Sequence, residues 1–97
     1  DRGKVWFSTE TQRSENGEIE LTVSISGKGK HKIGIRTFNA VADKTEHEAV
    51  LSGNKPVVLK VRLTDIDPEK PWVTVIMADN DPGLSSEVVG SFVEPTF

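Results

Sequence analysis

Apolar and polar residues alternate with a period of two along most of the chain. Residues 18–26 carry an aliphatic side chain at every second position, with Glu, Thr or Ser between them. Residues 57–63 repeat this pattern, with Lys60 and Arg62 on the polar face. Such alternation predicts strands of an antiparallel sheet with one face buried. Helical periodicity is almost absent, because residues 40–51, the one weak helix candidate, show no clear apolar stripe.

Turn signals divide the chain into short segments. Asn16-Gly17, the glycine-rich residues 27–30, residues 52–56 and residues 79–83 all have turn or loop composition. The strands expected between them cover residues 4–11, 18–26, 31–39, 46–51, 57–63, 72–78 and 87–93. Short strands with one apolar face must bury it against a second layer, so the predicted fold is an all-β, seven-stranded antiparallel two-sheet sandwich. A closed barrel is the alternative.

The composition limits the range of functions. With 97 residues the chain has room for one core, so we expect residues 1–97 to form a single domain. There is no cysteine, which excludes disulfides and thiolate metal sites. The net charge of −3 argues against nucleic acid as a partner, and no apolar run is long enough for membrane insertion. The chain starts without Met, so we expect it to be a piece of a longer protein.

The second half of the chain carries a corner, a strand and a loop in a recognisable spacing. The pattern reads Leu63-Thr64-x-Ile66-x-Pro68-x-x-x-Trp72-x-Thr74-x-Ile76-x-Ala78-x-Asn80-x-x-Gly83-x-Ser85, followed by Ser91-Phe92-x-x-Pro95. It resembles the second half of a fibronectin type III domain over about 35 residues. The resemblance implies an immunoglobulin-like sandwich in which Trp72 closes one end of the core. It also implies that Trp72, Thr74, Ile76 and Ala78 face inward.

Two features depart from that family. The strand at residues 18–26 lacks the tryptophan that the family usually places there, and Trp72 replaces the tyrosine of the corner. An indole only donates a hydrogen bond, so it cannot replace every role of a tyrosine hydroxyl. These departures point toward the wider immunoglobulin-like group, which includes accessory sandwiches of carbohydrate-active enzymes.

Three groups of residues are candidate contacts for a protein partner or for a neighbouring domain of the same chain. The first is the basic segment Lys28, Lys30, His31 and Lys32, which has a spacing suited to a polyanion such as a sulfated glycan. The second is the acidic turn Asp79, Asn80 and Asp81, which is either a turn former or, with Glu87, a calcium site. In a fibronectin-like order the two segments lie at the same end, where their charges compensate each other.

The third group is an apolar row. If Trp72 and its alternate residues face inward, Val73, Val75 and Met77 form an outward row that invites a protein partner. In the opposite phase these three residues are simply core. Both tryptophans, Trp6 and Trp72, are expected to lie in the core or to plug its ends, with an exposed Trp6 as the alternative.

No catalytic signature is present. The chain has two histidines, no serine in a Gly-x-Ser-x-Gly elbow and no glycine-rich loop before a helix. We expect no enzyme activity and no cofactor. The expected function is a protein-interaction and spacer module of a multidomain extracellular or cell-surface protein. The alternatives are an accessory, glycan-binding sandwich of a carbohydrate-active enzyme and a structural module of an intracellular or viral protein.

Overall fold

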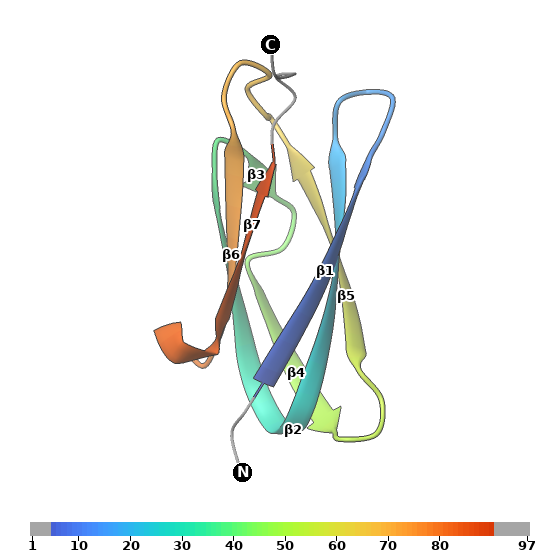
Figure 1. Ribbon diagram of the computed structural model, residues 1–97, viewed down its shortest axis with the longest axis vertical. Coiled ribbons are helices and arrows are strands. Elements are labelled where there is room, and N and C mark those ends of the chain that lie inside the picture. The colour runs from blue at the N-terminus through green and yellow to red at the C-terminus, as the bar shows by residue number, and fades with distance from the viewer. Residues whose placement is uncertain (1–4, 91–97) are drawn as a thin grey trace, which may run out of the picture.

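The computed structural model describes residues 5–90, and every strand ladder in this part is antiparallel (Figure 1). No α-helix occurs among these residues. The elements are β1 (Val5–Arg13), β2 (Ile19–Phe38), β3 (Val41–Ala42), β4 (Glu46–Ser52), β5 (Val57–Thr64), β6 (Trp72–Ala78), the 3₁₀ turn η1 (Pro82–Leu84) and β7 (Ser85–Gly90). The two-residue strand β3, which pairs with the end of β5, was not predicted.

The strand β2 is continuous through the segment that was predicted to be a loop. It runs for 20 residues, so the predicted break at residues 27–30 is wrong. Residues 28–34 stay extended because they pair with β4. Gly27 and Gly29 have φ of 149° and 94°, values that favour glycine, and they lie where β2 bends. Figure 1 shows the two halves of β2 running in opposite directions on either side of this bend.

The bend divides the strand pairings into two sets. The first half of β2 pairs with β1 and β5, and β5 pairs with β3. The second half pairs with β4 and β6, and β6 pairs with β7. All seven strands are therefore linked through β2 into one antiparallel system, an arrangement compatible with a β-sandwich.

One apolar core joins the two sets. The predicted alternation is confirmed: the inward residues of both halves of β2, and those of β5 and β6, are buried. The core contains Val5, Ile19, Leu21, Val23, Ile25, Ile33, Ile35, Ala49, Leu51, Leu59, Val61, Leu63, Trp72, Ile76 and Ala78. Burying these side chains is the main favourable contribution to folding.

Trp72 is buried, as predicted. Its side chain is 3% exposed, and its partner in the ladder is Gly90 of β7. A methyl group at Gly90 would lie 2.4 Å from the indole ring, so the absence of a side chain there makes room for Trp72. The strand predicted at residues 87–93 starts earlier, at Ser85, and is described to Gly90. Residues 91–93, and the Ser91-Phe92-x-x-Pro95 part of the motif, lie outside the described residues.

Candidate functional site

The outer face of β2, β6 and β7 carries exposed apolar side chains. The predicted phase is confirmed, because Thr74, Ile76 and Ala78 are fully buried. Their neighbours along β6 therefore face outward and are partly exposed. Phe38 on β2 and Val89 on β7 face the same way, with exposures of 60% and 59%. We call this surface the outer strip, and it consists of Phe38, Val73, Val75, Met77 and Val89.

The strand register orders the outer strip into three rows. The first row is Phe38, Val73 and Val89, which lie directly opposite one another on the three strands. The second is Arg36, Val75 and Glu87, and the third is Gly34, Met77 and Ser85. The apolar residues thus follow β6 lengthwise and spread to both neighbours at the first row. The charged residues flank β6 at the second row.

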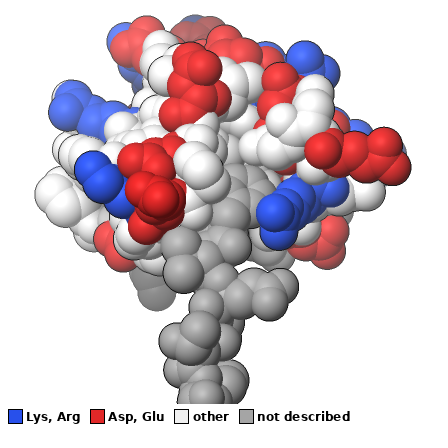
Figure 2. Space-filling view, turned by 90° about the horizontal axis from the view of Figure 1, so that it is seen from above, with Lys and Arg blue, Asp and Glu red and all other residues white. Residues whose placement is uncertain are grey.

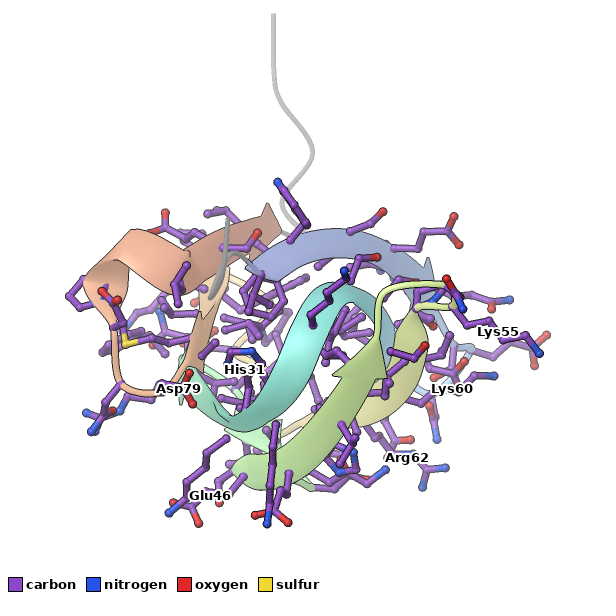
Figure 3. The ribbon with its side chains drawn as sticks, turned by 90° about the horizontal axis from the view of Figure 1, so that it is seen from below. His31, Glu46, Lys55, Lys60, Arg62 and Asp79 are labelled. Atoms are coloured by element: carbon purple, nitrogen blue, oxygen red, sulfur yellow. The ribbon has the colours of Figure 1, made fainter. Side chains whose placement is uncertain are left out.

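The bend of β2 meets the turn after β6 at the other candidate cluster. His31 is buried, and its Nδ1 lies 2.6 Å from Oδ2 of Asp79 (Figure 3). Its Nε2 lies 2.8 Å from the carbonyl oxygen of Lys28. A carbonyl oxygen and a carboxylate both accept hydrogen bonds, so these two partners favour the protonated imidazolium, in which each ring nitrogen can donate one. The hydrogen bond to Asp79 is the main reason that the pKa of His31 is raised.

Asp79 also fixes the register between β2 and the end of β6. Its Oδ1 accepts a hydrogen bond from the backbone N–H of Lys32 at 3.0 Å, and its own N–H donates to the carbonyl of Lys32 at 2.7 Å. The hydrogen bond from His31 is also the main cause that lowers the pKa of Asp79. The expected proximity of the basic and acidic segments is therefore confirmed for His31 and Asp79.

The acidic residues at 79–81 form a tight turn. Asp79 and Asn80 both have positive φ, 54° and 58°, and the N–H of Asp81 bonds to the carbonyl of Ala78. Asp81 then accepts a hydrogen bond from the N–H of Gly83 at the start of η1. Asp and Asn tolerate this left-handed conformation better than most residues. Within residues 5–90, no group of three or more acidic, histidine or cysteine side chains is arranged to hold a metal ion.

Two lysines of the basic segment, Lys30 and Lys32, face glutamates rather than the acidic turn. Nζ of Lys30 lies 3.4 Å from Glu48, and Nζ of Lys32 lies 3.5 Å from Glu46, both on β4. All four side chains are about two-thirds exposed, so each pair adds little stability. The pairs do reduce the local positive potential that a polyanion would need.

A depression lies beside the outer strip, along β2 where β4 begins. It has a volume of about 550 Å³, and its lining includes Arg36, Phe38, Thr45 and Glu46. A partner that covered the outer strip would meet this depression next to Phe38. The outer strip and the depression together offer a partner an apolar area and a concave surface.

Trp6 was expected in the core, and that expectation is wrong. Its side chain is 60% exposed, because Val5 and Phe7 occupy the inward positions of β1 on either side of it. Its partner in the ladder is Ser26, and the next outward row contains Ser8, Ser24 and Val58. The exposed indole therefore lies beside small polar side chains on the outer face of β1, β2 and β5.

The charged residues form no extensive patch of one sign on the face seen in Figure 2, where acidic and basic side chains are interspersed. Among the described residues, no helix is long and apolar enough to cross a membrane.

The sequence identified the part of the outer strip on β6 and missed Phe38 and Val89. A signal for Phe38 was present, because it shares the outward parity of Arg36 once Ile33 and Ile35 are taken as inward. The alignment of Phe38 with Val89 across β6 depends on strand register, which one strand's pattern does not specify. Comparisons with protein-family models, with curated proteins and with solved structures found no match to this chain.

Proposed function

We propose that the chain is a non-catalytic protein-interaction and spacer module of a multidomain extracellular or cell-surface protein. The bend of β2 folds the strand system into two layers, which gives the module an immunoglobulin-like, fibronectin type III-like architecture. Two features support this architecture. The two sets of pairings, β1–β2–β5 and β4–β2–β6–β7, share one core, and Trp72 lies buried where the motif of residues 63–85 implies it.

The outer strip is the observation that carries the proposed function. Phe38 and Val89 expose more than half of their side chains although they flank Val73 in one row. Aliphatic and aromatic side chains are most stable out of water, so an exposed row across three strands favours burial by a partner. Aromatic residues, phenylalanine among them, are enriched at protein–protein interfaces.

Site-specific photo-crosslinking tests this function. A photoreactive phenylalanine analogue replaces Val89 in one variant and Glu10, on the opposite outer face, in a matched control. The variants are exposed to extracellular and membrane fractions of the source tissue or culture, and the crosslinked peptides are sequenced. A partner peptide crosslinked through position 89 and not through position 10 is then made in pure form and titrated against the chain.

The expected result is saturable binding. Val75→Lys should weaken this binding at least about tenfold, because the charged lysine would lose its water shell when the apolar contact buries it. Circular dichroism of Val75→Lys should remain that of the parent chain, since Val75 faces outward. Equal crosslinking from both positions, or binding that Val75→Lys leaves unchanged, would refute the docking role of the outer strip.

A second candidate function is glycan binding, and the exposure of Trp6 favours it. An exposed indole offers a flat apolar surface to the C–H groups of a sugar ring, while Ser8, Ser24 and Ser26 offer hydroxyl groups nearby. Titration with a panel of polysaccharides, followed by tryptophan emission, tests this candidate. Trp72 is buried, so a change that disappears in Trp6→Phe would support glycan binding. An unchanged spectrum with every glycan would remove the candidate.

A further inference from the structure

The charges that flank the outer strip restrict what can cover it. Arg36 and Glu87 are both exposed, and they lie on opposite sides of Val75 in the middle row. Neighbouring strands are about 4.8 Å apart, so the two residues start from backbones roughly 10 Å apart. None of the ion pairs found among residues 5–90 includes either of them. A partner that presents a negative group to Arg36 and a positive group to Glu87 would therefore complement both charges when it buries this row.

The outer strip itself provides this complement. We propose that it binds the outer strip of a second copy of the chain, about a two-fold axis that runs parallel to β6. This inference rests on the proposed function and names its partner. A two-fold symmetric contact uses the same patch on both copies, so the patch must complement itself.

In each row, rotation about that axis places the residue on one side of β6 opposite the residue from the other side of β6 in the second copy. It exchanges the two sides of β6 and keeps each row at its own level. Arg36 then faces Glu87 of the second copy, and Glu87 faces its Arg36, while Val75 packs on Val75. In the first row Phe38 faces Val89 of the second copy.

The third row provides room for the longest side chain on the axis. Met77 packs on Met77 of the second copy, and its neighbours in the row are Gly34 and Ser85, which are small. Flexible thioether side chains adapt well to such a contact.

The other symmetric way of stacking the two faces is disfavoured by the same residues. A two-fold axis perpendicular to β6, in the plane of the contact, reverses the strand direction and keeps each side of β6 in place. Arg36 would then face Arg36, and Glu87 would face Glu87. Like charges brought together out of water repel each other strongly, so the charge pattern selects the axis parallel to β6.

Sheet twist leaves this charge match in place. Two stacked sheets cross at about 30° because each is twisted, so rows drift apart with distance from the centre of the contact. The row that carries Arg36 and Glu87 is the middle one, where the drift is smallest. Both side chains are also long enough to follow the remaining offset.

Analytical ultracentrifugation of the 97-residue chain tests the proposal. The parent chain should form a dimer, and Arg36→Glu or Glu87→Arg should each weaken dimerisation about 100-fold, because two attractive contacts become repulsive in the symmetric pair. The double variant Arg36→Glu/Glu87→Arg should recover the dimer, because it restores both pairs with their signs exchanged. Glu10→Arg makes the same charge change on the opposite outer face and should leave dimerisation unchanged.

Mixing the two single variants provides the sharpest result. One variant then carries two glutamates in the middle row and the other carries two arginines, so the mixture should form a heterodimer although each variant alone is a monomer. Circular dichroism of each single variant should match the parent chain, which separates lost association from lost folding.

A parent chain that stays monomeric over the accessible concentration range would overturn the second copy as partner. A dimer that both charge reversals leave intact would also overturn it, because the contact would then lie elsewhere. Neither outcome removes the proposed function, which is refuted separately when Val75→Lys fails to weaken binding of the peptide crosslinked through position 89.

Discussion

Replacing Gly90 by alanine tests whether Trp72 closes the core as the structure indicates. Gly90 lies opposite Trp72 in the β6–β7 ladder. A Cβ atom built on it would lie 2.4, 2.6 and 2.8 Å from three atoms of the indole ring. Carbon atoms pack best at about 3.5–4.0 Å, so the ring must move by about 1 Å or β7 must separate from β6.

The size of the effect follows from the burial of the ring. Trp72 is 3% exposed and belongs to the core cluster, so a displaced indole pushes on neighbours that have little free space. Overpacking of this kind typically costs about 1–3 kcal/mol. For a domain of this length that corresponds to a fall in melting temperature of roughly 4–8 °C for each kcal/mol.

Gly34→Ala is the matched control. Gly34 also lies in a strand, and a Cβ there would approach only the carbonyl oxygen of Met77, at 3.9 Å. We expect this variant to be as stable as the parent chain or more stable by about 0.5 kcal/mol, because alanine restricts the unfolded chain more than glycine does.

Urea unfolding at one low protein concentration, followed by circular dichroism, gives the free energy of unfolding for each variant. Combining Gly90→Ala with Trp72→Phe completes a double-mutant cycle, in which the smaller ring should relieve much of the cost of the methyl group. A Gly90→Ala variant within about 0.5 kcal/mol of the parent chain, the range of an ordinary surface substitution, would contradict this role of Trp72. An equal cost of Gly90→Ala in the Trp72→Phe background would contradict it too.

Three further predictions concern the core, the bend of β2 and pH. The hydroxyl of Thr74 is fully buried and has no hydrogen-bond partner among the described residues, so Thr74→Val should stabilise the chain by about 1 kcal/mol in urea unfolding, whereas Thr74→Ala should not. Gly29 has φ of 94°, and a Cβ there would make only an ordinary contact with Nε2 of His31, at 3.6 Å, so Gly29→Ala should lower the free energy of unfolding by about 1 kcal/mol, mainly through backbone strain, and an unchanged midpoint would contradict this. The pKa of His31 is raised from its ordinary value of 6.5 and that of Asp79 is lowered from 3.8. The stabilisation from this pair is therefore complete between about pH 4 and 6.5, and it is lost as pH rises through the folded pKa of His31 or falls through that of Asp79. Unfolding measured at pH 5.5 and 8.5 should show a larger loss of stability in the parent chain than in His31→Gln, and equal losses would refute the assignment.

The alternation of apolar and polar side chains predicted most of the core residues, because in a half-buried strand it shows directly which residues face inward. On β2 and β5, one apolar face is enough to specify which residues point inward, and Leu21, Val23 and Val61 are completely buried as expected. The residues of β6 alone left its phase open, since Val73, Val75 and Met77 are as apolar as the residues that are buried. The fibronectin-like spacing implied the phase that the structure has.

The continuity of β2 could not be predicted from the same pattern. Gly27 and Gly29 lie among lysines, a composition typical of a loop, and the local sequence contains no signal that residues 28–34 will pair with β4. Strand pairing between distant segments is a property of the whole fold. The glycines still serve the turn function that their composition suggests, because they allow the bend.

Trp6 shows that the pattern of apolar residues does not specify the inward face when consecutive residues of a strand are all apolar. A large aromatic side chain is usually buried, which favoured a core position. Its two neighbours are also apolar, however, and only one side of β1 faces the core. Val5 and Phe7 have the inward parity, so Trp6 is left outside, and the choice between the two phases depends on the pairing of β1 with β2.

The register between β2 and β6 connects the buried cluster at His31 to the exposed outer strip. A slip of one residue would turn the outward side chains of β2 toward the core and separate Phe38 from Val73. Asp79 opposes such a slip, because its backbone and its carboxylate both bond to the backbone of Lys32, and the carboxylate also binds His31. The alignment of Arg36 with Val75, on which the proposed dimer contact depends, is therefore held by contacts at the end of the ladder. None of these contacts uses a side chain of the outer strip, so a substitution in the strip such as Val75→Lys should leave the register unchanged.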